Sequence, residues 1–438
     1  MTPMLWGAGV LVALLFLLGI GTPIAFALGF VSIAALILAD GWGSLSILGE
    51  TFFGGLASFG LVSIPMFILM GAAVASSPAG KDLYEALDRW LNRVPGGLVL
   101  SNLGACSIFA ALSGSSPATC AAIGKMGIPE MTKRGYPNEI AAGSIAAGGT
   151  LGILIPPSIT MIVYGIATET SIGRLFLAGL LPGALLTALF MAWTIFDCRR
   201  RGIGLDALGR RFTFRERFAA LPRVLPFLGI IAAILFVLYG GIATPSEAAG
   251  VGALFCLIFV AVIYRLWRLS LYNSLFRDTL KESVMIMMII GASELFSFAL
   301  SSLFITQTIA EWIAALDVNA WVLMAIINVF LLFAGFFLPP VAVILMTAPI
   351  LLPIIIQAGF DPYWFAVVLT INMEIGLITP PVGLNLYVIN GIAPNITLGE
   401  ILRGSLPYVG CMVAAIVLLC LMPGIALWLP NLVMGTAL

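Results

Sequence analysis

The stretch Gly152-Ile-Leu-Ile-Pro-Pro-Ser158 decides the fold, because the chain repeats it as Gly376-Leu-Ile-Thr-Pro-Pro-Val382. The same offset relates residues 113–119 to residues 337–343. Consecutive prolines lack the N–H group and clash with the preceding turn, so each copy must interrupt an apolar helix. Two interrupted apolar segments at equivalent points of two halves indicate the binding site of a transporter.

Composition places the chain in a membrane. Its 438 residues are 61% hydrophobic and only 9% charged, with a mean hydropathy of +1.14, whereas soluble domains carry about 25% charged residues. Histidine is absent and the six cysteines show no CxxC spacing, so neither a zinc site nor a disulfide framework is expected. The net charge of zero gives no indication of nucleic acid, and no Walker A sequence is present to bind ATP.

The pattern predicts an all-α polytopic membrane protein with inverted repeats, two re-entrant helical hairpins and two broken helices. Its predicted segments are a helix pair (5–20, 23–38), a loop (41–60), a short span (64–74), a surface helix (81–93), a hairpin (98–131), a broken span (138–167) and a full span (175–196). Two central spans (225–240, 248–264) precede another span (284–300), a second hairpin (321–356), a second broken span (365–393) and a last span (406–429). The predicted domains are N-terminal scaffold helices (1–54), a first repeat (55–197), a basic cytoplasmic loop with central scaffold helices (198–282) and a second repeat (283–438).

Positive charge predicts the orientation. The loops at 77–97, 133–137, 197–223, 265–282 and 394–404 share one side in this topology. They hold every Lys and Arg except Arg174, on the far side, and Lys125, in the returning limb of the first hairpin. The positive-inside rule makes that side cytoplasmic, so the two halves enter the membrane from opposite sides. The arginines of residues 199–223 are expected to contact anionic lipid headgroups.

Interrupted helices leave backbone groups without partners, which a membrane tolerates only around a cavity or a ligand. Free carbonyl ends suit Na⁺, and free N–H ends with hydroxyls suit an anion. We therefore expect two or more Na⁺ sites that flank one substrate site. The predicted cation ligands are Ser113, Gly114, Ser115, Gly152, Pro156, Gly335, Leu338, Gly376, Thr379 and Glu374. The predicted substrate contacts are Ser115, Ser116, Thr119 and Ser158.

Other interpretations of the same residues stay open. Each Pro-Pro pair can be a structural kink, and the small residues of the first tip can be a helix-packing surface. Glu374 can bind a cation or a proton, or it can hydrogen-bond to the broken backbone. An intramembrane hydrolase is disfavoured because the chain has no histidine and no paired aspartates at helix depth. A channel is disfavoured because re-entrant segments in inverted repeats suit alternating access better.

Four motifs carry a resemblance to a known family: residues 113–119, 155–183, 243–248, and Asn372-Met-Glu-Ile-Gly-Leu-Ile-Thr-Pro-Pro-Val-Gly-Leu-Asn-Leu386. They resemble the large membrane subunit of tripartite ATP-independent periplasmic (TRAP) transporters. The resemblance implies the ion-transporter superfamily fold and an elevator-type mechanism. It further implies Na⁺-coupled import of an organic acid, such as a C4-dicarboxylate or sialic acid, and no enzymatic activity.

The resemblance also implies a bacterial inner-membrane location and two protein partners, a periplasmic binding protein and a separate small four-helix membrane subunit. The alternative is a stand-alone Na⁺- or H⁺-coupled anion carrier of the same superfamily. One difference bears on substrate preference: the family usually has an acidic residue before the proline of the second tip, where this chain has Pro339.

Overall fold

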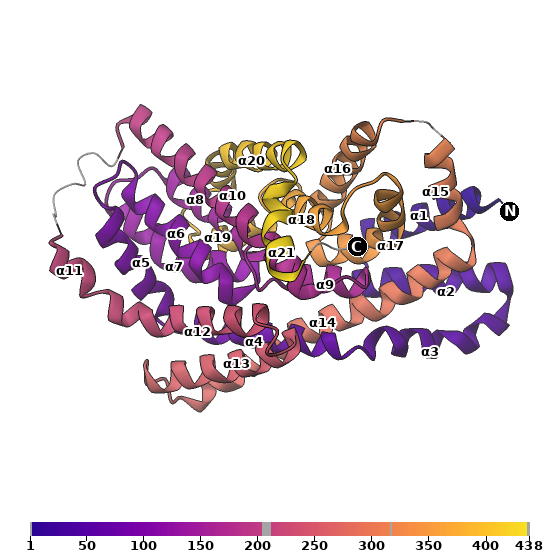
Figure 1. The fold of residues 1–438 in the computed structure, drawn as a ribbon, viewed down its shortest axis with the longest axis horizontal. Coiled ribbons are helices and arrows are strands. Elements are labelled where there is room, and N and C mark those ends of the chain that lie inside the picture. The colour runs from indigo at the N-terminus through magenta and orange to yellow at the C-terminus, as the bar shows by residue number, and fades with distance from the viewer. Residues whose placement is uncertain (1, 204–211, 316–317, 436–438) are drawn as a thin grey trace.

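The computed structural model describes residues 2–203, 212–315 and 318–435, and all regular secondary structure in these ranges is helical (Figure 1). Its first part contains α1 (Pro3–Gly19), α2 (Ile24–Asp40), η1 (Trp42–Ser44), α3 (Leu45–Leu56), η2 (Phe59–Val62), α4 (Ser63–Ala75), α5 (Ala79–Leu91), α6 (Gly97–Ser113), α7 (Ser116–Lys133), α8 (Asn138–Leu154), α9 (Ile159–Ala167) and α10 (Ile172–Arg201). The remainder contains α11 (Phe214–Phe218), α12 (Leu221–Tyr239), α13 (Pro245–Val262), α14 (Leu269–Ser302), α15 (Ile305–Ala315), α16 (Ala320–Phe337), α17 (Pro340–Gln357), α18 (Pro362–Leu377), α19 (Leu384–Ile392), α20 (Leu398–Leu421) and α21 (Gly424–Met434).

The helices confirm a polytopic membrane architecture. Within the described ranges, 8 helices are long and apolar enough to cross a membrane, or up to 9 if the bent pair over residues 42–75 forms one span. Large apolar side chains such as Phe16 and Phe236 are exposed on the outside of the molecule, as a hydrocarbon environment requires.

Two parts of the chain share one order of elements. In each, a helical hairpin with a two-residue tip precedes a helix that is interrupted at the Pro-Pro pair. The first set is α6 to α9, with a tip at residues 114–115 and a break at 155–158. The second set is α16 to α19, with a tip at 338–339 and a break at 378–383. The predicted positions of both hairpins and both breaks are confirmed, although residues 116–119 of the expected first tip already belong to α7.

The first half of each broken helix lies in the core. All residues of α8 from Ile140 onward and all residues of α18 from Trp364 onward are buried. Small residues let other helices approach α8 closely: a Cβ added to Gly143 would lie 2.2 Å from the backbone of Gly404 in α20. Such contacts are typical of helix packing in membranes, and they let α20 pack closely against α8.

Two sequence expectations are wrong. Residues 41–60 were expected as a loop, but most of them form α3, which packs against α14. A Cβ added to Gly55 would lie 2.2 Å from Glu294 of α14, so this close packing stabilises a helix of low intrinsic propensity. The expected last span of residues 406–429 is divided into α20 and α21, because Pro423 cannot continue the helix.

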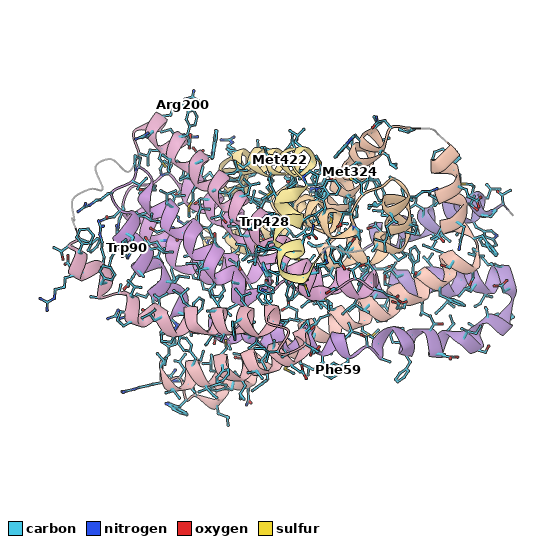
Figure 2. All side chains as sticks on the ribbon, in the orientation of Figure 1. Phe59, Trp90, Arg200, Met324, Met422 and Trp428 are labelled. Carbon is cyan, nitrogen blue, oxygen red and sulfur yellow. The ribbon has the colours of Figure 1, made fainter. Side chains whose placement is uncertain are left out.

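The helix predicted over residues 81–93 is confirmed as α5, which contacts both the first hairpin and the central helices α11 and α12. Its position on the membrane surface stays a prediction. Its Trp90 packs edge-to-face on Phe218 of α11, with ring centroids 5.5 Å apart. Figure 2 shows Trp90 and Arg200 toward the same end of the molecule. The Arg89 side chain donates to the Glu216 carbonyl at 2.8 Å, so the basic segments 77–97 and 197–223 lie near one another.

Candidate functional site

The first tip (residues 114–115) packs directly against the first broken helix, next to its break (residues 155–158). The Ser113 and Thr119 hydroxyl oxygens are 2.6 Å apart, and Thr119 donates to the Ser115 carbonyl at 2.9 Å. A Cβ added to Gly152 would lie 2.6 Å from that carbonyl oxygen, so only glycine fits there. Five predicted residues, Ser113, Gly114, Ser115, Thr119 and Gly152, therefore come together. Gly114 adopts a positive φ of 58°, and its carbonyl accepts a 3.4 Å hydrogen bond from the Ile159 N–H.

Ser158 and Pro156 are buried within the break. The Ser158 hydroxyl donates to the Ile153 carbonyl at 2.5 Å and accepts from the Met161 N–H at 3.3 Å. Ser158 thus caps α9 and satisfies one carbonyl that the break leaves free. In this arrangement the Ser158 hydroxyl stabilises the broken backbone. Its contact with substrate stays a prediction.

A similar contact occurs in the second set, where the last turn of α16, just before the second tip, packs against the end of α18. A Cβ added to Gly376 would lie 2.3 Å from the Gly335 carbonyl oxygen. The Val382 N–H donates to the Phe336 carbonyl at 3.2 Å, which parallels the bond from Ile159 to Gly114. Leu338 ends α16, and Thr379, just beyond α18, donates its hydroxyl to the Ile375 carbonyl. Both predicted tip-and-break pairs therefore exist as packed units.

Glu374 joins the two sets of helices. The Ser116 hydroxyl lies 3.0 and 3.1 Å from the two carboxylate oxygens of Glu374, and both residues have no exposed surface. The carboxylate also interacts with the backbone of Ile153. It thus lies beside the first break and at the N-terminus of α7, where a helix favours negative charge. The sequence singled out both residues, but no spacing indicated that they meet.

Asn385, near the start of α19, is a buried polar residue that the sequence analysis did not select. It has no exposed surface, and its amide donates to the Ala146 carbonyl of α8 at 3.2 Å. Its side-chain oxygen has no hydrogen-bond partner among the described residues. The available signal was an amide two residues after Gly383 in an otherwise apolar run, since buried polar groups in membranes usually have a role.

The surface left open at the tips and breaks carries no charge. Its exposed residues are Pro339, Pro380, Pro381 and Val382, and its half-buried residues include Ser115, Pro117, Ala118, Leu338 and Thr379. Backbone carbonyls and hydroxyls are the polar groups available here. These oxygens fit a hard cation such as Na⁺, which prefers oxygen ligands, as Ca²⁺ and Mg²⁺ do.

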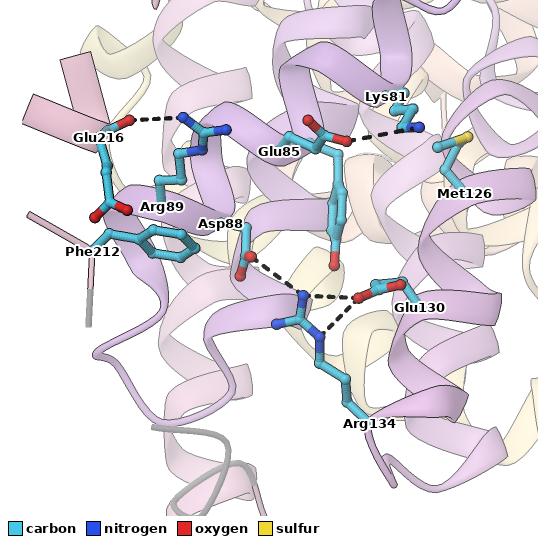
Figure 3. A pocket seen from close by; sticks show the side chains of 10 residues that line it. Lys81, Glu85, Asp88, Arg89, Met126, Glu130, Arg134, Phe212 and Glu216 are labelled. Atoms are coloured by element: carbon cyan, nitrogen blue, oxygen red, sulfur yellow. Dashed lines mark hydrogen bonds and ion pairs between the residues drawn. The ribbon is translucent and has the colours of Figure 1, made fainter. Parts of the chain in front are cut away.

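A polar cavity of about 640 Å³ lies elsewhere, between α5, α7 and α11 (Figure 3). Arg134 of that cavity lies 3.6 Å from Asp88 and 2.8 Å from Glu130, while Arg89 donates to the Glu216 carbonyl at 2.8 Å. Burial raises the pKa of Asp88 although Arg134 opposes this shift. No predicted site residue lines this cavity, so it does not belong to the tips and breaks.

Comparisons with known proteins agree with the resemblance. The family model of the tripartite ATP-independent periplasmic transporter, DctM component, matches residues 11–425. A C4-dicarboxylate TRAP transporter large permease protein, DctM, of Pseudomonas aeruginosa is 40% identical, over 85% of this chain and 86% of that protein. The sialic acid large permease SiaM of Vibrio cholerae is 31% identical, over 96% and 97% of the two chains.

Two further proteins bear on architecture. The isethionate TRAP permease DctMQ of Oleidesulfovibrio alaskensis is 34% identical over 93% of this chain, which corresponds to only 64% of that longer protein. The solved YdaH transporter of Alcanivorax borkumensis has the same fold, with a TM-score of 0.64 at 16% identity over 90% of this chain and 91% of its own.

The relatives are inner-membrane permease subunits and not enzymes, which agrees with the multi-pass helices described above. The motifs at both tips and breaks, the extent of the family match and the identity to DctM all lead to one assignment. The chain belongs to the DctM family of large permease subunits of TRAP transporters.

Proposed function

We propose that this chain is the permease subunit of a Na⁺-coupled importer that carries an organic acid delivered by a periplasmic binding protein. The observation that carries the proposal is the pair of packed tip-and-break units, with the Ser115 carbonyl against Gly152 and the Gly335 carbonyl against Gly376. The Gly335 carbonyl lies in the last turn of α16, where partial negative charge favours a cation. The Ser115 carbonyl lies in the first tip, just beyond the C-terminus of α6.

The first Na⁺ site would use Ser113, Gly114 and Ser115 with Gly152 and Pro156. The second would use Gly335 and Leu338 with Gly376 and Thr379. Glu374 lies behind the first tip through Ser116, so its carboxylate would add negative charge near the first cation. Na⁺ bound at both units would hold the tips against the breaks, which would complete the substrate site.

The substrate would bind between the units, near Ser115, Ser116, Thr119 and Ser158. The helices α7, α9, α17 and α19 all begin at a tip or a break, so their N-termini supply N–H groups to an anion. The named relatives transport C4-dicarboxylates, sialic acid and isethionate, which are all acids. Pro339 at the open surface favours a substrate without a cationic group, since it supplies no carboxylate.

The two hairpins and two broken helices would move as one transport unit against the remaining helices, in an elevator-type cycle between inverted repeats. A small four-helix membrane subunit and a periplasmic binding protein would complete the transporter. The longer DctMQ relative supports a second membrane component. Exposed arginines of residues 199–223, such as Arg199, Arg200 and Arg215, would contact anionic lipid headgroups. Arg217 is buried, and Arg210 and Arg211 lie outside the described residues.

Uptake into proteoliposomes tests the proposal. Vesicles would contain this chain and its small partner, with an inward Na⁺ gradient, radiolabelled organic acids, and the cognate binding protein present or omitted. Uptake that needs both Na⁺ and the binding protein is expected. Uptake that needs Na⁺ but no binding protein would instead favour a stand-alone carrier. Uptake that does not depend on Na⁺ would contradict both proposed cation sites.

A further inference from the structure

Lys125 is the one cationic side chain within the helices that form the two hairpins and the two broken helices, apart from Lys133 at the last position of α7. The helices α6, α8, α9 and α16 to α19 contain no Lys or Arg. The surface at the tips and breaks is also uncharged. An anion that passes through this part of the molecule therefore has few cationic partners, and Lys125 is the one nearest to the first tip along α7.

Lys125 lies on the open face of α7. Ala118, Ala122, Lys125 and Pro129 recur at spacings of three and four residues, and all are half-buried or exposed, as one face of a helix requires. The opposite face, with Thr119, Cys120 and Ile123, is buried. Lys125 stands roughly 13 Å along the helix from Ser116 at 1.5 Å per residue. It thus continues the same open surface that begins at the first tip.

A second helix from the site, α19, packs against the buried side of α7. A Cβ added to Gly124 would lie 3.2 Å from Ile389 and 3.5 Å from Ile392 of α19. The exposed residues of α19 are Leu384, Tyr387 and Gly391, which also share one face. Both α7 and α19 begin at the site and end at loops that the charge pattern predicts to be cytoplasmic. The open face of α7 therefore leads from the first tip toward this predicted cytoplasmic end, and an anion that leaves the site along this route would pass Lys125.

The charge of Lys125 is not used within the described part of the chain. No ion pair or hydrogen bond joins Lys125 to another described side chain, whereas Glu130, one turn further along α7, already pairs with Arg134. A membrane-embedded lysine faces a protein interior or a water-filled route rather than lipid. An unpaired lysine on this route is suited to meet an anion that leaves the site.

We propose that Lys125 is a specificity-determining residue that binds the acid group of the substrate on its route between the tips and the cytoplasmic end of α7. This inference rests on the proposed import of an organic acid. The competing explanation is that Lys125 extends to the lipid headgroups and only anchors α7. The two explanations differ in what the positive charge changes. A substrate contact changes the concentration of acid for half-maximal uptake, whereas an anchor changes the amount of reconstituted transporter, so uptake is compared per reconstituted transporter.

Charge replacement at one cysteine tests the proposal. The variant Lys125→Cys would be purified with its small partner, treated with a cationic aminoethyl or an anionic sulfonatoethyl methanethiosulfonate, reconstituted, and assayed for Na⁺-driven uptake with the binding protein. We expect uptake of the acid to fall about fivefold in Lys125→Cys, the effect of one ion pair at 4 Å in water. The cationic reagent and the variant Lys125→Arg should restore uptake, whereas the anionic reagent should not.

The matched control is Lys133→Cys, an exposed lysine on the same helix, which should transport normally with either reagent. Treated wild type controls for the native cysteines, of which four are buried and two are half-buried. Normal uptake by Lys125→Cys, equal restoration by both reagents, or the same loss in Lys133→Cys would overturn this inference alone. A wild type that shows no Na⁺-driven uptake would overturn the proposed function as well.

Discussion

At the scale of single residues, two glycines hold the candidate site together. Gly152 and Gly376 let a carbonyl of the neighbouring hairpin come closer than any side chain would permit, 2.6 and 2.3 Å from the added Cβ atoms. These carbonyl oxygens are proposed Na⁺ ligands. Because glycine has no side chain, each oxygen can lie close to the broken helix, where the proposed cation would bind. A Cβ atom added at either glycine should therefore disturb a proposed Na⁺ site and weaken the coupling of uptake to Na⁺.

We predict that Gly152→Ala and Gly376→Ala each lower Na⁺-driven uptake by about tenfold or more, since forcing a methyl group into packed space costs roughly 1–3 kcal/mol. The tip would move away from the break, and the Na⁺ concentration for half-maximal uptake would rise. The control is Gly410→Ala in α20, where an added Cβ meets nothing within 4 Å. Wild-type Na⁺ dependence in both break variants would show that these contacts do not form the cation sites.

At the scale of elements, α5 depends on charges that the first hairpin supplies. Asp88 of α5 is 6% exposed, and one of its carboxylate oxygens has no hydrogen-bond partner among the described residues. Arg134, just after α7, compensates its charge at 3.6 Å. The Asp88 carboxylate also interacts electrostatically with Tyr84, Glu130, Arg89 and Tyr136. Burial still dominates, so the pKa of Asp88 lies above its ordinary value.

Removal of Arg134 should therefore destabilise the protein in a pH-dependent way. A carboxyl whose pKa is raised on folding contributes stability below its unfolded pKa, near 3.8, and loses that contribution as pH rises through its folded pKa. Arg134→Met should raise the folded pKa further and cost about 1–3 kcal/mol at pH 8, but less at pH 5. Thermal unfolding in detergent at both values checks this. The double variant with Asp88→Asn should lose the pH dependence, and equal losses at both pH values would contradict the argument.

The elements also show what the sequence could and could not predict. Pro156–Pro157 and Pro380–Pro381 interrupt helices by local chemistry alone, so both breaks and both hairpins followed from the repeated pattern. The helix α3 depends on packing of Gly55 against Glu294, which no local pattern reveals. The hydrogen bond from the Ser158 hydroxyl to the Ile153 carbonyl was equally hidden, because this carbonyl becomes available only when the helix breaks.

At the scale of the whole molecule, one buried contact connects the two similar sets of helices. Ser116 belongs to the first hairpin and Glu374 to the second broken helix, and their side chains meet where neither is exposed. A buried carboxylate is costly unless hydrogen bonds or charges compensate it. Burial of this group thus requires that both sets be in place together, so the contact couples their folding and would make them move as one unit.

A double-mutant cycle measures that coupling. Ser116→Ala and Glu374→Gln should each lower the free energy of unfolding. The loss in the double variant should be smaller than the sum of the two single losses, by about 1 kcal/mol or more, since the effects of residues in contact are not additive. Ser107→Ala is the control, because its hydroxyl bonds to Leu103 and Thr187 instead, so it should add to Glu374→Gln. Additive losses for Ser116 and Glu374 would mean that the two sets of helices are stabilised independently. A coupled pair whose uptake also falls in both single variants would connect the buried carboxylate to transport by the assembled molecule.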